Sequence, residues 1–114
     1  MKAFAFLAFV LIPSSTFAQS HCGGQTQLEI NFCAHEKWAI ADGELNRLWK
    51  EIKPVADARG DGQALLKEQR AWLKMRDATC DPELTSGGSA DAMFYWACME
   101  EQTLKRNQAL AAWR

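Results

Sequence analysis

The 114-residue sequence lacks the features of several large protein classes. No segment alternates apolar and polar residues with the period of two that marks a half-buried strand, so we expect no β-sheet. No apolar run reaches the roughly 20 residues that a transmembrane helix needs. Phosphate-binding glycine loops, nucleophile elbows and the haem motif Cys-x-x-Cys-His are also missing. We therefore expect no cofactor and no catalytic residues, and we predict that the protein is not an enzyme.

Excess positive charge is missing as well. Without Lys2, which lies in a short N-terminal leader, the chain carries 12 basic and 14 acidic side chains, a net charge of −2. Lysine and arginine alternate with aspartate and glutamate along every segment instead of forming a basic stripe. A nucleic-acid partner is therefore not expected, whereas a weakly acidic protein favours a basic partner.

The leader has the pattern of a cleaved signal peptide, predicted here for residues 1–18. Lys2 gives it a positive start, residues 3–12 are uninterruptedly apolar, and a Pro-Ser-Ser break precedes a small-residue site at Ala18. The apolar run is too short to span a bilayer, and no cysteine follows the site directly. We expect a single domain over residues 19–114, periplasmic or secreted, with no membrane insertion after cleavage.

Apolar residues recur at helical spacing in three segments of this domain. The first predicted helix begins at a capping-box pattern at Thr26 and ends near Ile52, because Pro54 follows. The second spans about 63–79, and the third follows a glycine-rich loop with Ser89 as its N-cap. The predicted fold class is all-α, a small three-helix bundle stapled by two disulfides.

Four cysteines lie behind the leader: Cys22, Cys33, Cys80 and Cys98. An even number in a short exported chain indicates disulfides, each worth roughly 3 kcal/mol on the chain-entropy model. Three connectivities are possible. We favour neighbours, Cys22 with Cys33 and Cys80 with Cys98. The main competitor joins Cys33 to Cys80 and Cys22 to Cys98.

A zinc site is the alternative use of the first two cysteines, because His21 and His35 lie beside Cys22 and Cys33. These are suitable ligand types for zinc. The compact Cys-x-x-Cys spacing is absent, and in an oxidising compartment the thiols are expected to pair instead. We therefore predict no metal site.

Polar side chains interrupt the apolar stripes of all three predicted helices: Asp42, Asn46, Gln69, Arg76, Thr103 and Arg106. A buried, unpaired charge is costly, so we expect these groups to find one another across the bundle. In our hypothesis Asp42 accepts from Arg76 or Arg106, with Asn46 and Gln69 bridging. A structural network is favoured over a catalytic cluster, because neither a nucleophile nor a histidine accompanies it.

The spacing of residues over nearly the whole domain forms a family pattern, carried by Cys22, Thr26, Glu29, Cys33, Ala41, Asp42, Leu45, Asn46, the block from Gln69 to Cys80, the Gly-Gly-Ser loop, Cys98, Thr103, Arg106 and Leu110. The most specific part is Gln-Arg-Ala-Trp followed by Arg-Asp-x-x-Cys in the middle block. This pattern resembles the LprI-like lysozyme-inhibitor domain. The resemblance implies an exported all-α domain with disulfides that binds and inhibits lysozyme.

Inhibition requires an element that occupies the lysozyme cleft, which contains two carboxylates. Our candidate is the loop between Cys80 and Cys98, with its residues Ser86, Gly87, Gly88 and Ser89. A disulfide at its base would lower the ordering cost of binding. The same glycines are equally compatible with a plain helix connection, and exposed tryptophans are an alternative contact surface. The alternative function is an envelope binding module or immunity-type module with another protein partner.

Overall fold

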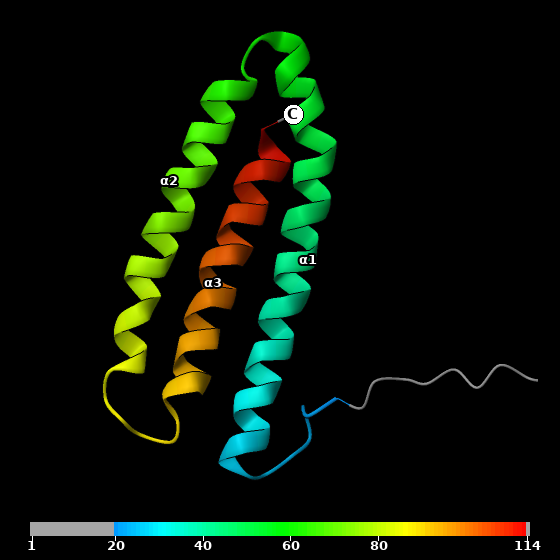
Figure 1. The fold of residues 1–114 in the computed structure, drawn as a ribbon. Coiled ribbons are helices and arrows are strands. Elements are labelled where there is room, and N and C mark those ends of the chain that lie inside the picture. Colours follow the sequence, from blue (N-terminus) through cyan, green and yellow to red (C-terminus); the bar gives the residue numbers. More distant parts are fainter. Residues whose placement is uncertain (1–19, 114) are drawn as a thin grey trace, which may run out of the picture.

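The computed structural model describes residues 20–113, which fold into three long α-helices and one short 3-10 helix (Figure 1). The elements are α1 (Gln27–Arg59), α2 (Gly62–Cys80), η1 (Asp81–Leu84) and α3 (Asp91–Ala112). The described residues contain no strand. The predicted fold class, an all-α three-helix bundle with two disulfides, is confirmed. The predicted leader, 1–18, lies outside the described residues.

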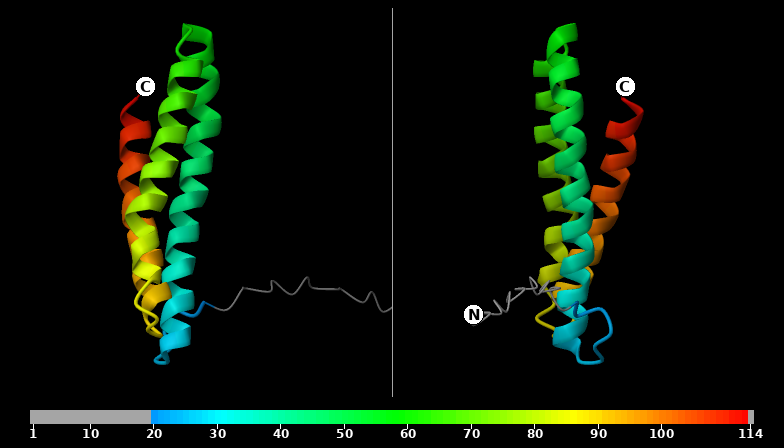
Figure 2. Two further views of the ribbon diagram at one scale, coloured as in Figure 1. Left: turned by 60° about the vertical axis from the view of Figure 1, so that its left-hand side comes forward. Right: turned by 90° about the vertical axis from the view of Figure 1, so that its right-hand side faces the viewer.

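The helices run antiparallel to their chain neighbours. In Figure 1 α3 lies between α1 and α2, and the second view of Figure 2 shows that it sits to one side of the pair that they form. α3 packs chiefly against α1, and α2 contacts both of the other helices. One side of the α1–α2 pair is therefore left without a covering helix.

The start of α1 agrees with the capping-box prediction. Thr26 has extended backbone angles, and its hydroxyl oxygen accepts a hydrogen bond from the backbone N–H of Glu29 at 3.2 Å. The Thr26 hydroxyl in turn donates to the Glu29 carboxylate at 2.9 Å. This cap satisfies one of the four amides that a helix start leaves without partners.

The prediction that the first helix ends near Ile52 is wrong, because α1 continues to Arg59 with Pro54 inside it. Proline costs the helix one hydrogen bond and some steric strain. On either side of it, however, Ile52 and Ala56 are 2% and 0% exposed. Burial of these two side chains offsets the cost, so tertiary packing overrides the local signal.

The helix ends instead at Gly60, whose φ of 84° is in the left-handed region. The Gly60 N–H donates to the Asp57 carbonyl at 3.1 Å, and the Asp61 N–H donates to the Ala56 carbonyl at 2.8 Å. These two bonds form a Schellman motif, which favours glycine at this position. The chain then reverses directly into α2.

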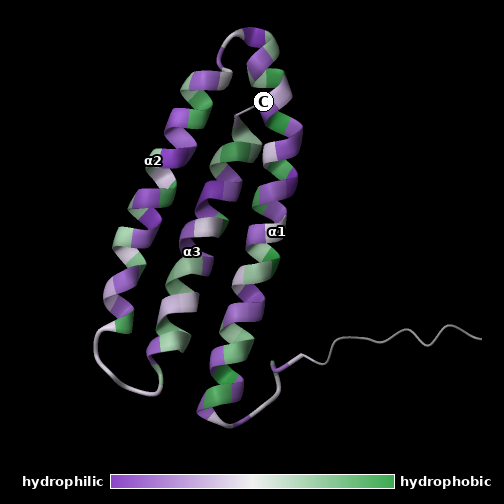
Figure 3. Ribbon diagram, in the orientation of Figure 1, coloured by the Kyte–Doolittle hydropathy of each residue, from purple (hydrophilic) through white to green (hydrophobic). Residues whose placement is uncertain are grey.

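The core is one cluster that all three long helices share: Leu45, Leu48, Ile52, Ala56, Leu65, Trp72 and Leu110, with Trp49, Leu73 and Trp113 packed against it. Figure 3 shows that each helix carries both hydrophobic and hydrophilic residues along its length. This is the pattern of amphipathic helices that bury one stripe each. Over residues 20–113, no helix has the length and hydropathy needed to cross a membrane.

Candidate functional site

Both disulfides join neighbouring cysteines, as the favoured connectivity predicted. Cys22 pairs with Cys33 at a Cα–Cα distance of 4.7 Å, and Cys80 pairs with Cys98 at 5.6 Å. The zinc alternative therefore loses both of its thiolates. Within the part of the chain that the structure describes, no group of three or more histidine, cysteine, aspartate or glutamate side chains is arranged to hold a metal ion.

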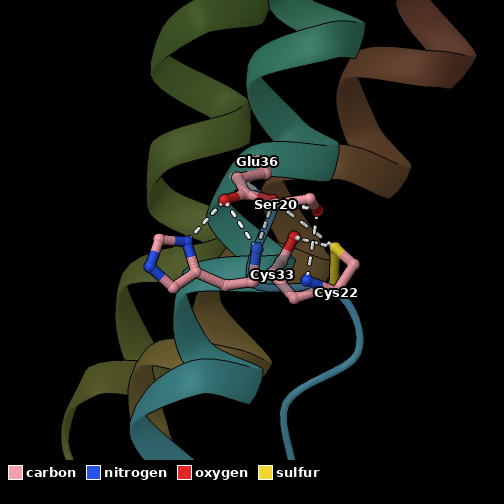
Figure 4. Close-up of a disulfide and its surroundings, with 5 residues drawn as sticks. Ser20, Cys22, Cys33 and Glu36 are labelled. Carbon is pink, nitrogen blue, oxygen red and sulfur yellow. Dashed lines mark hydrogen bonds and ion pairs between the residues drawn. A yellow bond between two sulfur atoms is a disulfide. The ribbon is translucent and has the colours of Figure 1, made fainter. Parts of the chain in front are cut away.

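The first disulfide attaches residues 20–26, which we call the N-terminal arm, to α1, and Figure 4 shows Ser20 and Cys22 close to Glu36. His21 Nδ1 lies 2.6 Å from Glu36 Oε1, and the Ser20 hydroxyl donates to Oε2 at 2.9 Å. The His21 backbone N–H also donates to this carboxylate, at 3.1 Å. These contacts, that of the His21 side chain first, lower the pKa of Glu36.

The candidate loop is organised around the carboxylate of Asp91 in the first turn of α3. That carboxylate accepts hydrogen bonds from the Ser86 hydroxyl and from the Gly87 N–H, the second at 2.9 Å. The Ser86 oxygen accepts from the Gly88 N–H at 3.2 Å, and the left-handed φ of 77° at Gly87 makes this turn possible. The loop therefore has a defined conformation in the free protein.

Contacts at both ends attach the loop to the bundle. The Cys80–Cys98 disulfide closes its base, and the carbonyl of Ser89 accepts from the Asn31 side chain of α1 at 3.0 Å. The prediction that Ser89 caps the third helix is wrong. Ala90 occupies the N-cap position without a side-chain cap, and the Asp91 carboxylate binds loop donors that precede the helix.

The segment closed by this disulfide is negatively charged. Between Cys80 and Cys98 the chain contains Asp81, Glu83 and Asp91 but no lysine, arginine or histidine. Burial raises the pKa of the Tyr95 hydroxyl, and the negative charges of Asp81 and Asp77 raise it further. We call this end of the molecule, residues 81–94, the acidic loop end.

Two large apolar side chains are exposed within the acidic loop end. Leu84 is 50% exposed and Phe94 is 52% exposed. Exposed aromatic and aliphatic side chains beside a rigid loop are the kind of anchor that protein interfaces use. The tryptophans offer less, because Trp72 is buried and the other four are partly buried.

The predicted polar network forms only in part, and its arginines have other partners than the one expected. Arg106 Nε donates to Gln69 Oε1 at 2.7 Å, and Arg106 Nη1 donates to Glu68 at 2.8 Å. Arg76 Nε donates to the neighbouring Asp77 at 3.2 Å. Among the described residues neither arginine bonds to Asp42, so our hypothesis is wrong about this acceptor.

Thr103, Asn46 and Asp42, the other members of the predicted network, do not bond to Arg106 or Gln69 among the described residues. Thr103 donates to the Met99 carbonyl of its own helix at 2.7 Å. Asn46 lies 3.5 Å from the Asp42 carboxylate, at the limit of a hydrogen bond. Four of the six nevertheless line one groove of about 310 Å³ between α1 and α2: Asp42, Asn46, Gln69 and Arg76.

Sequence reasoning missed several polar residues that fix this arrangement. Asn107 Nδ2 donates to the Ala41 carbonyl at 3.0 Å and so joins α3 to α1. Glu68 and Asp77 neutralise the two buried arginines. The position of Asp91 could have been predicted from the sequence, because an acidic residue just after a glycine-serine loop is favoured in the first turn of a helix.

Comparisons with known proteins place the chain in a family. A family model described as "Lysozyme inhibitor LprI" matches residues 18–110. An uncharacterized protein of Rhizobium meliloti (strain 1021) is 33% identical over 101 residues, a match that covers 75% of this chain and 71% of the relative. No solved structure gives a significant match. Because the family model spans most of the sequence, the chain belongs to the LprI lysozyme-inhibitor family.

Proposed function

We propose that this protein is exported and that it binds and inhibits a lysozyme-type cell-wall hydrolase. The observation that carries the proposal is the family match over residues 18–110. Export is supported by the signal-peptide pattern of residues 1–18. Two disulfides in a small domain suit an oxidising compartment.

The acidic loop end is the contact surface that we assign to inhibition. An enzyme that acts on an anionic cell-wall polymer is expected to have a cationic surface around its cleft, because opposite charge steers the substrate to it. Asp81 and Glu83 would face such a surface, and the exposed Leu84 and Phe94 would add apolar contact. Since the loop is already ordered, little conformational entropy is lost when it binds.

Within the loop, the hydroxyl of Ser89 is the donor that we assign to the carboxylates of the lysozyme cleft. The Ser86 hydroxyl and the Gly87 N–H already donate to Asp91, and the Gly88 N–H already donates to Ser86. The Ser89 side chain has no hydrogen-bond partner among the described residues. A donor without an internal partner is the one that binding can use at no internal cost.

The direct test is the rate at which chicken-type lysozyme clears a cell-wall suspension in the presence of the oxidised chain from residue 19 onwards. We expect dose-dependent, near-stoichiometric inhibition. Glu83→Lys should weaken it by about tenfold, because it reverses a charge on the contact surface. Glu101→Lys is the matched control, since Glu101 is exposed on α3 and its ion-pair partner in the described part of the chain is Lys105 of the same helix.

Two outcomes would count against the proposal. Equal loss of inhibition in both glutamate variants would place the contact outside the acidic loop end. Absence of inhibition toward chicken-type, goose-type and invertebrate-type lysozymes alike would reject lysozyme as the target. The alternative function, an envelope module with another protein partner, would then be the one to pursue by affinity capture.

A further inference from the structure

The groove between α1 and α2 contains polar side chains whose hydrogen-bonding groups the fold leaves unused. Asp42 and Asn46 line it from α1, and Gln69, Arg70 and Arg76 line it from α2. It is separate from the acidic loop end, whose residues are absent from its lining. The proposed inhibitory contact therefore does not account for it.

Arg76 is the main unused donor in this groove. Arg76 is only 9% exposed as a whole residue. Its guanidinium lies over the Trp72 ring, with 5.1 Å between Cζ and the ring centroid. Nε donates to Asp77, but Nη1 and Nη2 have no hydrogen-bond partner among the described residues. A guanidinium held in one orientation, with both terminal nitrogens free, presents the fork that binds a carboxylate bidentately.

Gln69 supplies a second fixed donor. It is 8% exposed, and its Oε1 accepts from Arg106 of α3. That bond determines how the amide is oriented, and it leaves the Nε2 donors without a partner among the described residues. Two largely buried polar residues, 9% and 8% exposed, thus contribute donors without a partner among the described residues to one groove.

The outer face of α2 extends this groove with positive charge. Lys67, Arg70 and Lys74 are exposed and form no ion pair among the described residues. The acidic residues of α2, Glu68 and Asp77, are already paired with arginines. We call Lys67, Arg70 and Lys74 the basic face of α2; on this face the alternation of charges expected from the sequence does not hold. Since the predicted mature chain has a net charge of −2, this local excess marks a surface for an anionic partner.

The rest of the lining is apolar and fits protein side chains. Leu45, Leu66 and Leu73 line the groove, and Trp49 joins them while packing against the core. Aliphatic side chains along a groove between two helices are the usual receptor for an amphipathic segment. A sugar would instead need a freely presented aromatic face, and the Trp49 ring is partly covered.

We propose that the α1–α2 groove binds an acidic, amphipathic peptide segment of a protein partner. A carboxylate of the segment pairs with Nη1 and Nη2 of Arg76, and Gln69 Nε2 donates to the same group or to a neighbouring carbonyl. Apolar side chains of the segment contact Leu66 and Leu73, and its further acidic residues face Arg70 and Lys74. Asp42 accepts from an N–H of the segment. This surface is independent of lysozyme inhibition.

The test uses NMR titration of the ¹⁵N-labelled oxidised chain with a synthetic peptide that carries leucine and glutamate at helical spacing. We expect saturable shifts at the Trp49 indole and the Gln69 side-chain amide, which weaken as salt is added. The doubly substituted variant Arg70→Glu/Lys74→Glu should bind at least about tenfold more weakly. Both positions are exposed, so the variant keeps the fold. Lys105→Glu, on the exposed surface of α3, is the charge-matched control and should bind like the parent.

The identity of the carboxylate-binding group is tested by Arg76→Lys, which keeps the charge but removes the fork. This variant should lose more affinity for the glutamate-containing peptide than for a control peptide in which every glutamate is replaced by glutamine. Equal binding of the two peptides by the parent protein would overturn the proposal, as would unchanged binding by the doubly substituted variant. Shifts with a chitin-type oligosaccharide and none with the peptide would also overturn it. Lysozyme inhibition is measured separately, so either proposal can fail alone.

Discussion

Arg106 of α3 donates a hydrogen bond from Nε to Oε1 of Gln69 on α2 at 2.7 Å, and both side chains are more than nine-tenths buried. A single arginine thus adds a polar contact between two helices that the Cys80–Cys98 disulfide also joins. Its second partner, Glu68, has a side chain that is 61% exposed, so this ion pair is only partly buried. The buried amide, more than the surface carboxylate, should therefore determine what Arg106 contributes to stability.

Arg106→Leu should lower the free energy of unfolding by about 1–3 kcal/mol, because it leaves Gln69 Oε1 buried without a donor. Glu68→Gln should change it by less, about 1 kcal/mol, because the solvent-exposed glutamine oxygen can still accept a hydrogen bond from Arg106 Nη1. Replacing both buried partners, Arg106→Leu with Gln69→Leu, should recover part of the loss. Urea denaturation of the three variants checks this. A double variant no more stable than Arg106→Leu alone would contradict it.

Asp42 should contribute little to stability despite its place in an apolar stripe. Among residues 20–113 its side chain accepts one hydrogen bond, from Asn46 at 3.5 Å, and neither buried arginine bonds to it. The free energy of unfolding of Asp42→Ala should therefore lie within about 0.5 kcal/mol of that of the parent. A thermal melt by circular dichroism measures this, and a large loss would restore Asp42 as a member of the buried network.

The two disulfides should differ in how much they stabilise the fold. Their sequence separations of 11 and 18 predict about 3 kcal/mol each on the chain-entropy model, with little difference between them. Cys80, however, is fully buried, whereas Cys22 belongs to the exposed arm. The pair Cys80→Ala/Cys98→Ala should therefore lower the melting temperature more than Cys22→Ala/Cys33→Ala. Equal losses would show that burial of Cys80 adds nothing.

Two glycines of α1 and its cap should respond to alanine with opposite signs. Gly60 has a φ of 84°, so Gly60→Ala should cost about 1–2 kcal/mol of backbone strain. Gly43 is exposed inside α1, and an added Cβ would meet no atom within 4 Å. Gly43→Ala should stabilise the protein by about 0.5–1 kcal/mol. Chemical denaturation of both variants tests the difference, and equal signs would contradict it.

The sequence predicted the number of helices, the start of α1 and the disulfide partners, because each depends on a local signal. Periodicity places the apolar stripes, and the Thr26 cap needs only its own turn. The end of α1 was mispredicted because burial of Ile52 and Ala56 outweighs the local cost of Pro54. Local rules treat a proline as a boundary, whereas only the tertiary structure shows what lies beyond it.

For the polar residues, too, the sequence predicted burial but not the hydrogen-bond partners. Their spacing indicated that Gln69, Arg76 and Arg106 would be buried, and they are. Their partners were not predictable, because a long arginine side chain can bond to several helix positions and the choice depends on the packing angle of the helices. Asp77 and Glu68 lie next to Arg76 and Gln69 in the sequence, yet only the structure shows that they take the arginine charges.

The N-terminal arm should be held to α1 in a pH-dependent way through Glu36. The ionised carboxylate accepts from Ser20 and lies beside His21, and these contacts lower the pKa of Glu36 below its ordinary value of 4.5. A carboxyl whose pKa is lowered by folding stabilises the folded state fully above that ordinary value. Its contribution is lost as the pH falls through the lowered folded pKa.

Glu36→Gln should abolish this dependence, because the amide keeps the shape of the side chain but does not titrate. The parent should therefore melt at a higher temperature than the variant at neutral pH, and the two melting temperatures should converge as the pH falls through the lowered pKa of Glu36. Glu44, whose pKa is lowered by Arg47, titrates in both proteins, so its effect cancels in the difference. A difference in melting temperature that stays constant down to acidic pH would show that the Glu36 carboxylate does not hold the arm.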